Sequence, residues 1–475
     1  MGIARTMILW ALLALAGGLL IALYLPGSGA SAQAPGAVSG QAIVPLQKLE
    51  EPIPQAQAKF GWSLALDGDY LVVGAPHYTA TCTPDVPSGS AYIFRRVPGS
   101  TIWTSVKRLS AGDDQPCDWF GYAVAIDGDT VVVGAPRSDL SDRQDAGAVY
   151  VFRRDKGGSN NWGQATKLTA TQPYTADRFG TAVTIAGDVI AVGAPRANVG
   201  SRLDAGLVYI FYRDLINPDQ WAQGKVISVS TSDRAAYDRF GSSLALNNET
   251  LVVGAPQPGY VHPKDPNQNV RPKTGVAYVF ERNQPGENQW GQMQKLVAPD
   301  GIENDQFGAC IHIAGDTIAV GAHQPGSSSW SIPPGPGAAY VFERNLGGDD
   351  QWEQRAKLSA AGGAPGDHFG FANYVLGDTI FVGAYLVDEG GKVDQGAAYV
   401  FERNAGGNSA WGQTAQLRAH DGKAEDGFGF AVAAQGNALL VGAPYVNRSA
   451  SILNAGAVYV FITDGHAVHL PVISR

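Results

Sequence analysis

One pattern of hydrophobic and polar positions occurs seven times along this chain. Each copy starts at Phe-Gly with alternating large and small residues, turns at a few polar residues, and continues as an apolar run ending in Gly-Ala. Next come a polar loop and a Tyr-Val/Ile-Phe segment. In six copies these are followed by a segment that runs from Trp to Leu or Ile. Since a regular internal period defines a repeat architecture, we expect one array of similar units. The copies begin 59 to 67 residues apart, at Phe60, Phe120, Phe179, Phe240, Phe307, Phe369 and Phe428.

Four β-strands are expected in each unit, as the unit that begins at Phe120 illustrates. Alternation over residues 120–126 predicts a first strand, and the apolar run 130–135 predicts a second strand buried on both faces. Asp127-Gly128-Asp129 between them suits a tight hairpin turn. Residues 148–152 and 162–168 are the third and fourth strands. The fold class is therefore all-β.

The last unit lacks a fourth strand, because the chain ends 14 residues after Phe461. The segment IVPLQKL at 43–49 supplies this strand from the other end of the chain, with Ile43 in the place of the Trp. An array that closes into a ring needs this permutation, and closure hides both edge strands. We therefore predict a seven-bladed β-propeller of four-stranded blades over residues 43–462, closed by the N-terminal strand that completes the last blade.

These motifs resemble the FG-GAP repeat family, whose members include the β-propellers of integrin α chains. The resemblance covers residues 43–462 and implies an extracellular propeller used for recognition or adhesion. Integrin-type repeats often carry a calcium loop, Asp-x-Asp-x-Asp-Gly, between the first two strands. Here that connection is Asp-Gly-Asp or similar, which is too short to surround a calcium ion, so we expect no cofactor. Gly-Ala-Pro is present in five units (74–76, 134–136, 193–195, 254–256, 442–444) and is Gly-Ala-His or Gly-Ala-Tyr in two (321–323, 383–385).

The N-terminal segment predicts export. Arg5, the apolar run 7–25 and Ala30-Ser31-Ala32 form a signal peptide over residues 1–32. The apolar run has 19 residues, nearly enough to span a bilayer, so an uncleaved anchor is the alternative. Residues 33–42 are a linker and residues 463–475 a C-terminal tail. We expect a monomer that is secreted or held at the cell surface.

Charge and cysteine usage narrow the function further. Charged residues make up 16% of the chain and the net charge is −9, which argues against a nucleic-acid partner. Cys82 lies in a second-to-third loop and Cys117 in the neighbouring fourth-to-first loop, so a disulfide is predicted, with two free thiols as the alternative. Cys310 occupies a small-residue position of a first strand, where it should be buried and unpaired.

Candidate chemistry lies on the face formed by the second-to-third and fourth-to-first connections, called the loop face here. Its fourth-to-first loops hold 15 acidic and 6 basic residues, and an acidic face could recruit cations or basic partners. Six of these acids stand two positions before the Phe, a regular placement that favours turn capping instead. They are Asp118, Asp177, Asp238, Asp305, Asp367 and Asp426.

Two segments resemble metal sites only in part. Asp265–Asn269 begins like a calcium loop but has Val270 where Gly is needed. His323, Asp367 and His368 belong to neighbouring segments of the loop face and could approach one another, although lone histidines are more often structural.

The regular Trp residues, five of them followed two positions later by Gln, could stack on carbohydrate, but their constant offset from the strand Leu favours packing. No Gly-x-Ser-x-Gly or His-Glu-x-x-His motif is present. The expected function is a non-enzymatic binding or adhesion propeller that recognises an extracellular protein or glycan through its loop face. The alternatives are a lectin-like propeller and a carbohydrate-active hydrolase that uses loop carboxylates.

Overall fold

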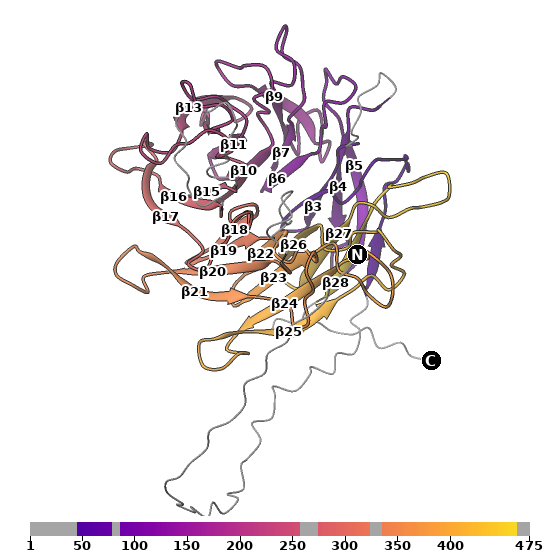
Figure 1. Cartoon of the computed structure of the whole chain (residues 1–475). Helices are drawn as coiled ribbons and strands as arrows, with labels where there is room; N and C mark the ends of the chain where they lie inside the picture. The colour runs from indigo at the N-terminus through magenta and orange to yellow at the C-terminus, as the bar shows by residue number, and fades with distance from the viewer. Residues whose placement is uncertain (1–44, 78–85, 257–273, 324–334, 463–475) are drawn as a thin grey trace, which may run out of the picture. The chain divides into compact units, whose positions relative to one another are not determined.

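The computed structural model describes residues 45–77, 86–256, 274–323 and 335–462. These residues form 28 β-strands in seven four-stranded antiparallel sheets (Figure 1). The part of the chain described contains no helix able to cross a membrane. The signal, linker and tail segments, including the apolar run 7–25, lie outside the described residues.

Each sheet is one blade of the propeller, and six blades take four consecutive strands. Blades 1 to 3 are β2 (Ser63–Asp67), β3 (Tyr70–Ala75), β4 (Ser90–Arg96), β5 (Trp103–Leu109); β6 (Ala123–Asp127), β7 (Thr130–Ala135), β8 (Ala148–Arg153), β9 (Gly163–Leu168); and β10 (Ala182–Ala186), β11 (Val189–Ala194), β12 (Leu207–Arg213), β13 (Trp221–Ile227). Blades 4 to 6 are β14 (Ser243–Asn247), β15 (Thr250–Ala255), β16 (Val276–Glu281), β17 (Gly291–Leu296); β18 (Ile311–Ala314), β19 (Thr317–Ala322), β20 (Ala338–Arg344), β21 (Trp352–Leu358); and β22 (Ala372–Leu376), β23 (Thr379–Ala384), β24 (Ala397–Arg403), β25 (Trp411–Leu417). Blade 7 is β26 (Ala431–Gln435), β27 (Ala438–Ala443), β28 (Ala457–Ile462) and β1 (Gln47–Leu49).

The blades close into a ring. The first strand of each blade contacts the first strand of the next, and β26 contacts β2. The first strands therefore surround the axis, which confirms the seven-bladed propeller. The pairing of the closing strand is also as predicted: β1 pairs antiparallel with β28, so that Gln47 lies opposite Val460 and Leu49 opposite Val458. The strand is shorter than predicted, because Pro45 and Leu46 lie before it rather than in it. Residues 43 and 44 of the predicted strand lie outside the described residues.

The apolar runs form the predicted buried second strands, whereas the first strands begin later than predicted. All residues of β7 are buried. β6 begins at Ala123 rather than Phe120, because Gly121 turns the chain at a φ of +92°. The Phe120 backbone bridges to Gly89 of the preceding blade, and its ring packs 5.5 Å from that of Tyr150. Phe-Gly is thus the junction between blades rather than the start of a strand.

The regular glycines lie at these same junctions. A Cβ on Gly89, which has a φ of +108°, would lie 2.1 Å from the Phe120 carbonyl oxygen. A Cβ on Gly134 of a Gly-Ala-Pro segment would lie 2.1 Å from the Gly180 carbonyl oxygen of the next blade. Only glycine permits such close backbone contact, so these motifs specify how neighbouring blades pack.

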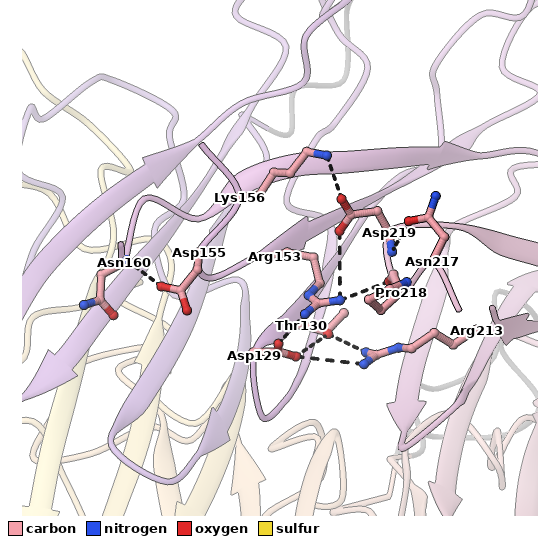
Figure 2. A network of polar contacts seen from close by, with 10 residues as sticks. All are labelled: Asp129, Thr130, Arg153, Asp155, Lys156, Asn160, Arg213, Asn217, Pro218 and Asp219. Carbon is pink, nitrogen blue, oxygen red and sulfur yellow. Dashed lines mark hydrogen bonds and ion pairs between the residues drawn. The ribbon is translucent and has the colours of Figure 1, made fainter. Parts of the chain in front are cut away.

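Ion pairs join neighbouring blades on the face opposite the loop face, called the turn face here (Figure 2). In blade 2, Arg153 pairs with Asp129 at 2.6 Å. Arg213 of blade 3 reaches across to Asp129 at 3.9 Å and donates a hydrogen bond to Thr130. Other pairs of this kind are Arg282–Asp188, Arg344–Glu281 and Arg403–Glu343. These charged residues of the turn face therefore help to hold neighbouring blades together.

Candidate functional site on the loop face

The regularly placed aspartates of the loop face cap turns, as predicted. Asp177 is 3% exposed, and its carboxylate accepts a hydrogen bond from the backbone N–H of Tyr174 at 2.9 Å. Its burial raises the pKa to about 6, against the lowering effect of the Tyr174 hydrogen bond. The other five aspartates accept the equivalent hydrogen bond, from Gln115, Ala235, Ile302, Ala364 and Lys423.

Glu51 caps the equivalent turn in blade 1, where Ala58 occupies the aspartate position. The Glu51 carboxylate accepts hydrogen bonds from the backbone N–H of Gln55 at 2.9 Å and from the Tyr92 hydroxyl. It is 2% exposed, and burial raises its pKa. Because Glu51 lies seven residues before Ala58, the regular spacing did not reveal this substitution.

Further loop acids are engaged in Tyr-Asp-Lys triads. Asp300 accepts hydrogen bonds from Tyr340 at 2.8 Å and Lys357 at 2.5 Å. The hydrogen bond from Lys357 is the largest cause of the lowered pKa of Asp300. Asp113 and Asp421 accept equivalent pairs of hydrogen bonds. The acidic surplus of the loop face is therefore largely structural, which argues against the alternative of an acidic binding surface.

An acidic cavity of about 390 Å³ lies between loops of blades 5 and 6. Its lining includes Asp367, Asp388, Glu389 and Asp394. Asp367 accepts the backbone N–H of Ala364, Asp388 that of Asp394, and Glu389 pairs with Arg418 at 2.9 Å. These contacts give three of the four acids a structural role.

The predicted histidine pair is brought together without forming a metal cluster. The rings of His323 and His368 lie 5.3 Å apart, while the Asp367 carboxylate faces its own turn. No group of three or more His, Cys, Asp or Glu within the described residues is arranged to hold a metal. Burial lowers the pKa of His323 to about 3. The segment Asp265–Asn269 lies outside the described residues.

The cysteine and tryptophan predictions have different outcomes. Cys82 lies outside the described residues and Cys117 is buried, so their disulfide stays a prediction. Cys310 is a free thiol whose pKa burial raises to about 11, but its residue is half-buried rather than fully buried. The regular tryptophans are 1% to 9% exposed, which confirms packing and argues against carbohydrate stacking on them: Trp103, Trp162, Trp221, Trp290, Trp352 and Trp411.

Aromatic side chains form an arc around part of the axis on the loop face. The arc begins with Trp119, whose ring stacks on Tyr122 at 5.7 Å. It is built on the residues two positions after Phe, which are aromatic in blades 1, 2, 6 and 7. Successive ring contacts of 4.4 to 5.6 Å continue it: Tyr122–Trp62, Trp62–Phe430, Phe430–Phe371 and Phe371–Tyr385. Thr181, Ser242 and Ala309 occupy the equivalent positions in blades 3 to 5.

Arginines occupy the part of the loop face next to this arc. Arg178, Arg196 and Arg239 line a cavity of about 230 Å³ together with Trp119 and Tyr122. Sequence reasoning missed this cluster because it looked for acids and metal ligands. The available signal was positional: Arg178 and Arg239 directly precede Phe, and Arg196 directly follows Gly-Ala-Pro.

The seven closed blades make this protein a β-propeller. It belongs to the FG-GAP repeat family, whose sequence profile matches residues 47–94, 103–152, 162–211, 224–280, 290–342, 352–401 and 411–461.

Integrin α chains are similar to part of the protein. Integrin alpha-PS3 of Drosophila melanogaster is 39% identical over 127 residues, which are 24% of this chain and 11% of that protein. Integrin alpha-X and Integrin alpha-D of Homo sapiens are 31% and 30% identical over 198 residues, 39% of this chain and 15% of each of those proteins. The similarity therefore spans a small part of each relative.

Proposed function

We propose that this protein is an extracellular binding or adhesion propeller that engages a protein partner through the axial part of its loop face. One observation carries the proposal. The seven units are alike wherever the fold requires it, yet differ at the equivalent positions two residues after Phe. A purely structural role would fill these positions alike, whereas an asymmetric partner needs an asymmetric surface. Similarity to integrin α chains supports an adhesive role at the cell exterior.

We propose further that the protein acts without catalysis. Most of the loop carboxylates that a glycan hydrolase would need are engaged in turn caps, triads and ion pairs. The regular tryptophans that a lectin would offer are buried. The side chains on which both alternatives depend are therefore largely engaged or buried, which favours a protein-binding surface.

An array of extracellular-matrix proteins, cell-surface proteins and glycans, probed with the full-length protein, tests the proposal. The informative variant is Phe371→Ala/Tyr385→Ala, which shortens the aromatic arc. The matched control is Leu215→Ala/Ile216→Ala on the turn face, where the two residues are 87% and 97% exposed. We expect binding to a protein that the first variant loses and the control keeps.

Three outcomes would contradict this function. Binding confined to glycans would favour the lectin-like propeller. Turnover of an arrayed glycan would favour the hydrolase. Equal loss of binding in both double variants would place the interaction away from the aromatic arc.

A further inference from the structure

The cavity lined by Arg178, Arg196 and Arg239 concentrates positive charge in a protein whose net charge is −9. Blade 3 contributes Arg196 from the end of its second strand, and Arg178 and Arg239 stand at the junctions before blades 3 and 4. All three residues are partly buried. The cavity is therefore formed where two adjacent blade junctions pack, and its arginines are not fully exposed.

Acidic residues only partly offset the positive charge of these arginines. Asp145 pairs with Arg137 at 3.0 Å and lies 3.8 Å from Arg178. Within the described residues, Arg196 and Arg239 form no ion pair, and the buried Nε of Arg239 has no hydrogen-bond acceptor. Burial lowers the pKa of Arg178 and of Arg239, and the positive charge of Arg196 lowers both further, while Asp145 opposes this lowering for Arg178 and Asp204 opposes it for Arg239. An anion in the cavity would relieve this repulsion.

Two hydroxyl groups that line the cavity are already engaged. The Thr181 hydroxyl donates a hydrogen bond to the Arg178 carbonyl oxygen and the Ser242 hydroxyl to that of Arg239, both at 2.7 Å. A sugar ring would need such hydroxyls as well as an open aromatic face. Trp119 offers none, because the guanidinium groups of Arg137 and Arg178 lie 4.8 and 5.2 Å from its ring.

The size of the cavity also favours a small acidic group over a sugar ring as its ligand. A volume of about 230 Å³ is below the range that houses a drug-sized ligand, but it accommodates one side chain. Guanidinium groups match the planar geometry of a carboxylate and bind it through charge-assisted hydrogen bonds. Desolvation inside the cavity strengthens those bonds relative to a surface ion pair.

We propose that this cavity binds the carboxylate of an aspartate or glutamate side chain presented by the protein partner, with Arg196 and Arg239 as the principal ligands. This inference rests on the proposed function for the identity of the partner as a protein. The recognised element is an acidic side chain that projects from the partner's surface into the cavity.

The probes are the blocked peptide acetyl-Gly-Asp-Gly-amide, its Asn analogue and a tetragalacturonate oligosaccharide, each titrated against the full-length protein by ligand-observed NMR. We expect saturable binding of the Asp peptide and about tenfold or greater weakening with the Asn analogue. Arg196→Ala and Arg239→Ala should each weaken the Asp peptide about tenfold or more.

The matched control is Arg202→Ala, in the second-to-third loop of blade 3 but outside the cavity lining. It removes the same charge and should change the affinity less than about twofold. Because Arg196 experiences repulsion, Arg196→Ala should keep or raise the melting temperature, so that lost binding cannot be attributed to unfolding.

Equal binding of the Asp and Asn peptides would overturn the proposal, as would equal effects of Arg196→Ala and Arg202→Ala. Binding of tetragalacturonate without the Asp peptide would assign the cavity to acidic glycans and overturn it too. A protein partner bound independently of Arg196 would contradict the proposed role of this cavity but not the proposed function. Arg196-dependent peptide binding without any partner on the array would support carboxylate binding in the cavity but contradict the proposed function.

Discussion

Lys48, in the strand that closes the ring, forms an ion pair with Asp421, with 2.6 Å between Nζ and Oδ2. The Tyr459 hydroxyl donates to the same carboxylate at 2.8 Å. The two ends of the described chain are thus joined by side chains as well as by the pairing of β1 with β28.

Closure should depend more on the apolar contact of β1 than on this ion pair. Leu49 is 3% exposed, so Leu49→Ala should lower the free energy of unfolding by about 2–4 kcal/mol. Lys48→Ala should cost at most about 1 kcal/mol, because both partners are partly exposed. Denaturant unfolding of the two variants measures the difference.

A chain that starts at Lys59 should be less stable and should self-associate through the exposed edge of β28. A monomer that kept full stability would contradict closure of the ring by β1.

The turn-capping aspartates predict a stability change at mildly acidic pH. Burial raises the folded-state pKa of Asp177 to about 6. Its contribution to the free energy of unfolding is therefore fully present below 3.8, the ordinary aspartate pKa, and is lost as pH rises through 6. Asp177→Asn removes this titration. Relative to that variant, the wild type should lose on the order of 2 kcal/mol of unfolding free energy between about pH 4 and 7. Parallel pH profiles of the two proteins would show that Asp177 is not buried as described.

The inter-blade ion pairs of the turn face should contribute modestly and respond to salt. Arg282 donates two hydrogen bonds of 2.9 Å to Asp188, so Arg282→Ala should cost about 1 kcal/mol at low ionic strength. Because these hydrogen bonds lower the pKa of Asp188, the cost should disappear as pH falls below the ordinary aspartate value of 3.8. Arg143→Ala, which removes an exposed pair with Asp142, is the control and should have almost no effect.

Calcium should have little effect on stability. The Asp-Gly-Asp turns are too short to wrap the ion, so adding EDTA to the purified protein should leave the melting temperature unchanged. The measurement is a thermal scan with and without chelator, followed by addition of calcium. A large drop that calcium reverses would reveal a calcium site.

The predicted Cys82–Cys117 disulfide is open to direct mapping. The export predicted from the N-terminal segment would favour oxidation, and closing this loop should add about 3–4 kcal/mol. Non-reducing peptide mapping of the exported protein should recover the cross-linked peptide, with Cys310 as the free thiol. Three alkylatable cysteines would refute the pairing.

The fold could be predicted because the units act as an internal comparison. The missing fourth strand after Phe461, the constant aspartate two positions before Phe and the constant Trp-to-Leu offset all gained meaning by repetition. Each describes a role that recurs in every blade, so its regular spacing was sufficient.

The proposed binding cavity could not be predicted in the same way, because its lining departs from the repeat pattern. Arg178, Arg196 and Arg239 are far apart in sequence and meet only because of the tight junctions between blades. Phe120 likewise looked like a strand residue, since the alternation that follows it continues without a break. The left-handed turn at Gly121 that separates it from the strand is a backbone property that alternation does not report.

The pairing of β1 with β28 also determines how the propeller would respond to tension. Gln47 lies opposite Val460, so the chain enters and leaves the ring at the same end of one strand pair. A force applied between these two points would open the backbone hydrogen bonds of β1 one after another, like a zipper, instead of shearing them together. Blade 7 would therefore yield first, at low force, while the loop face of the other six blades remained folded.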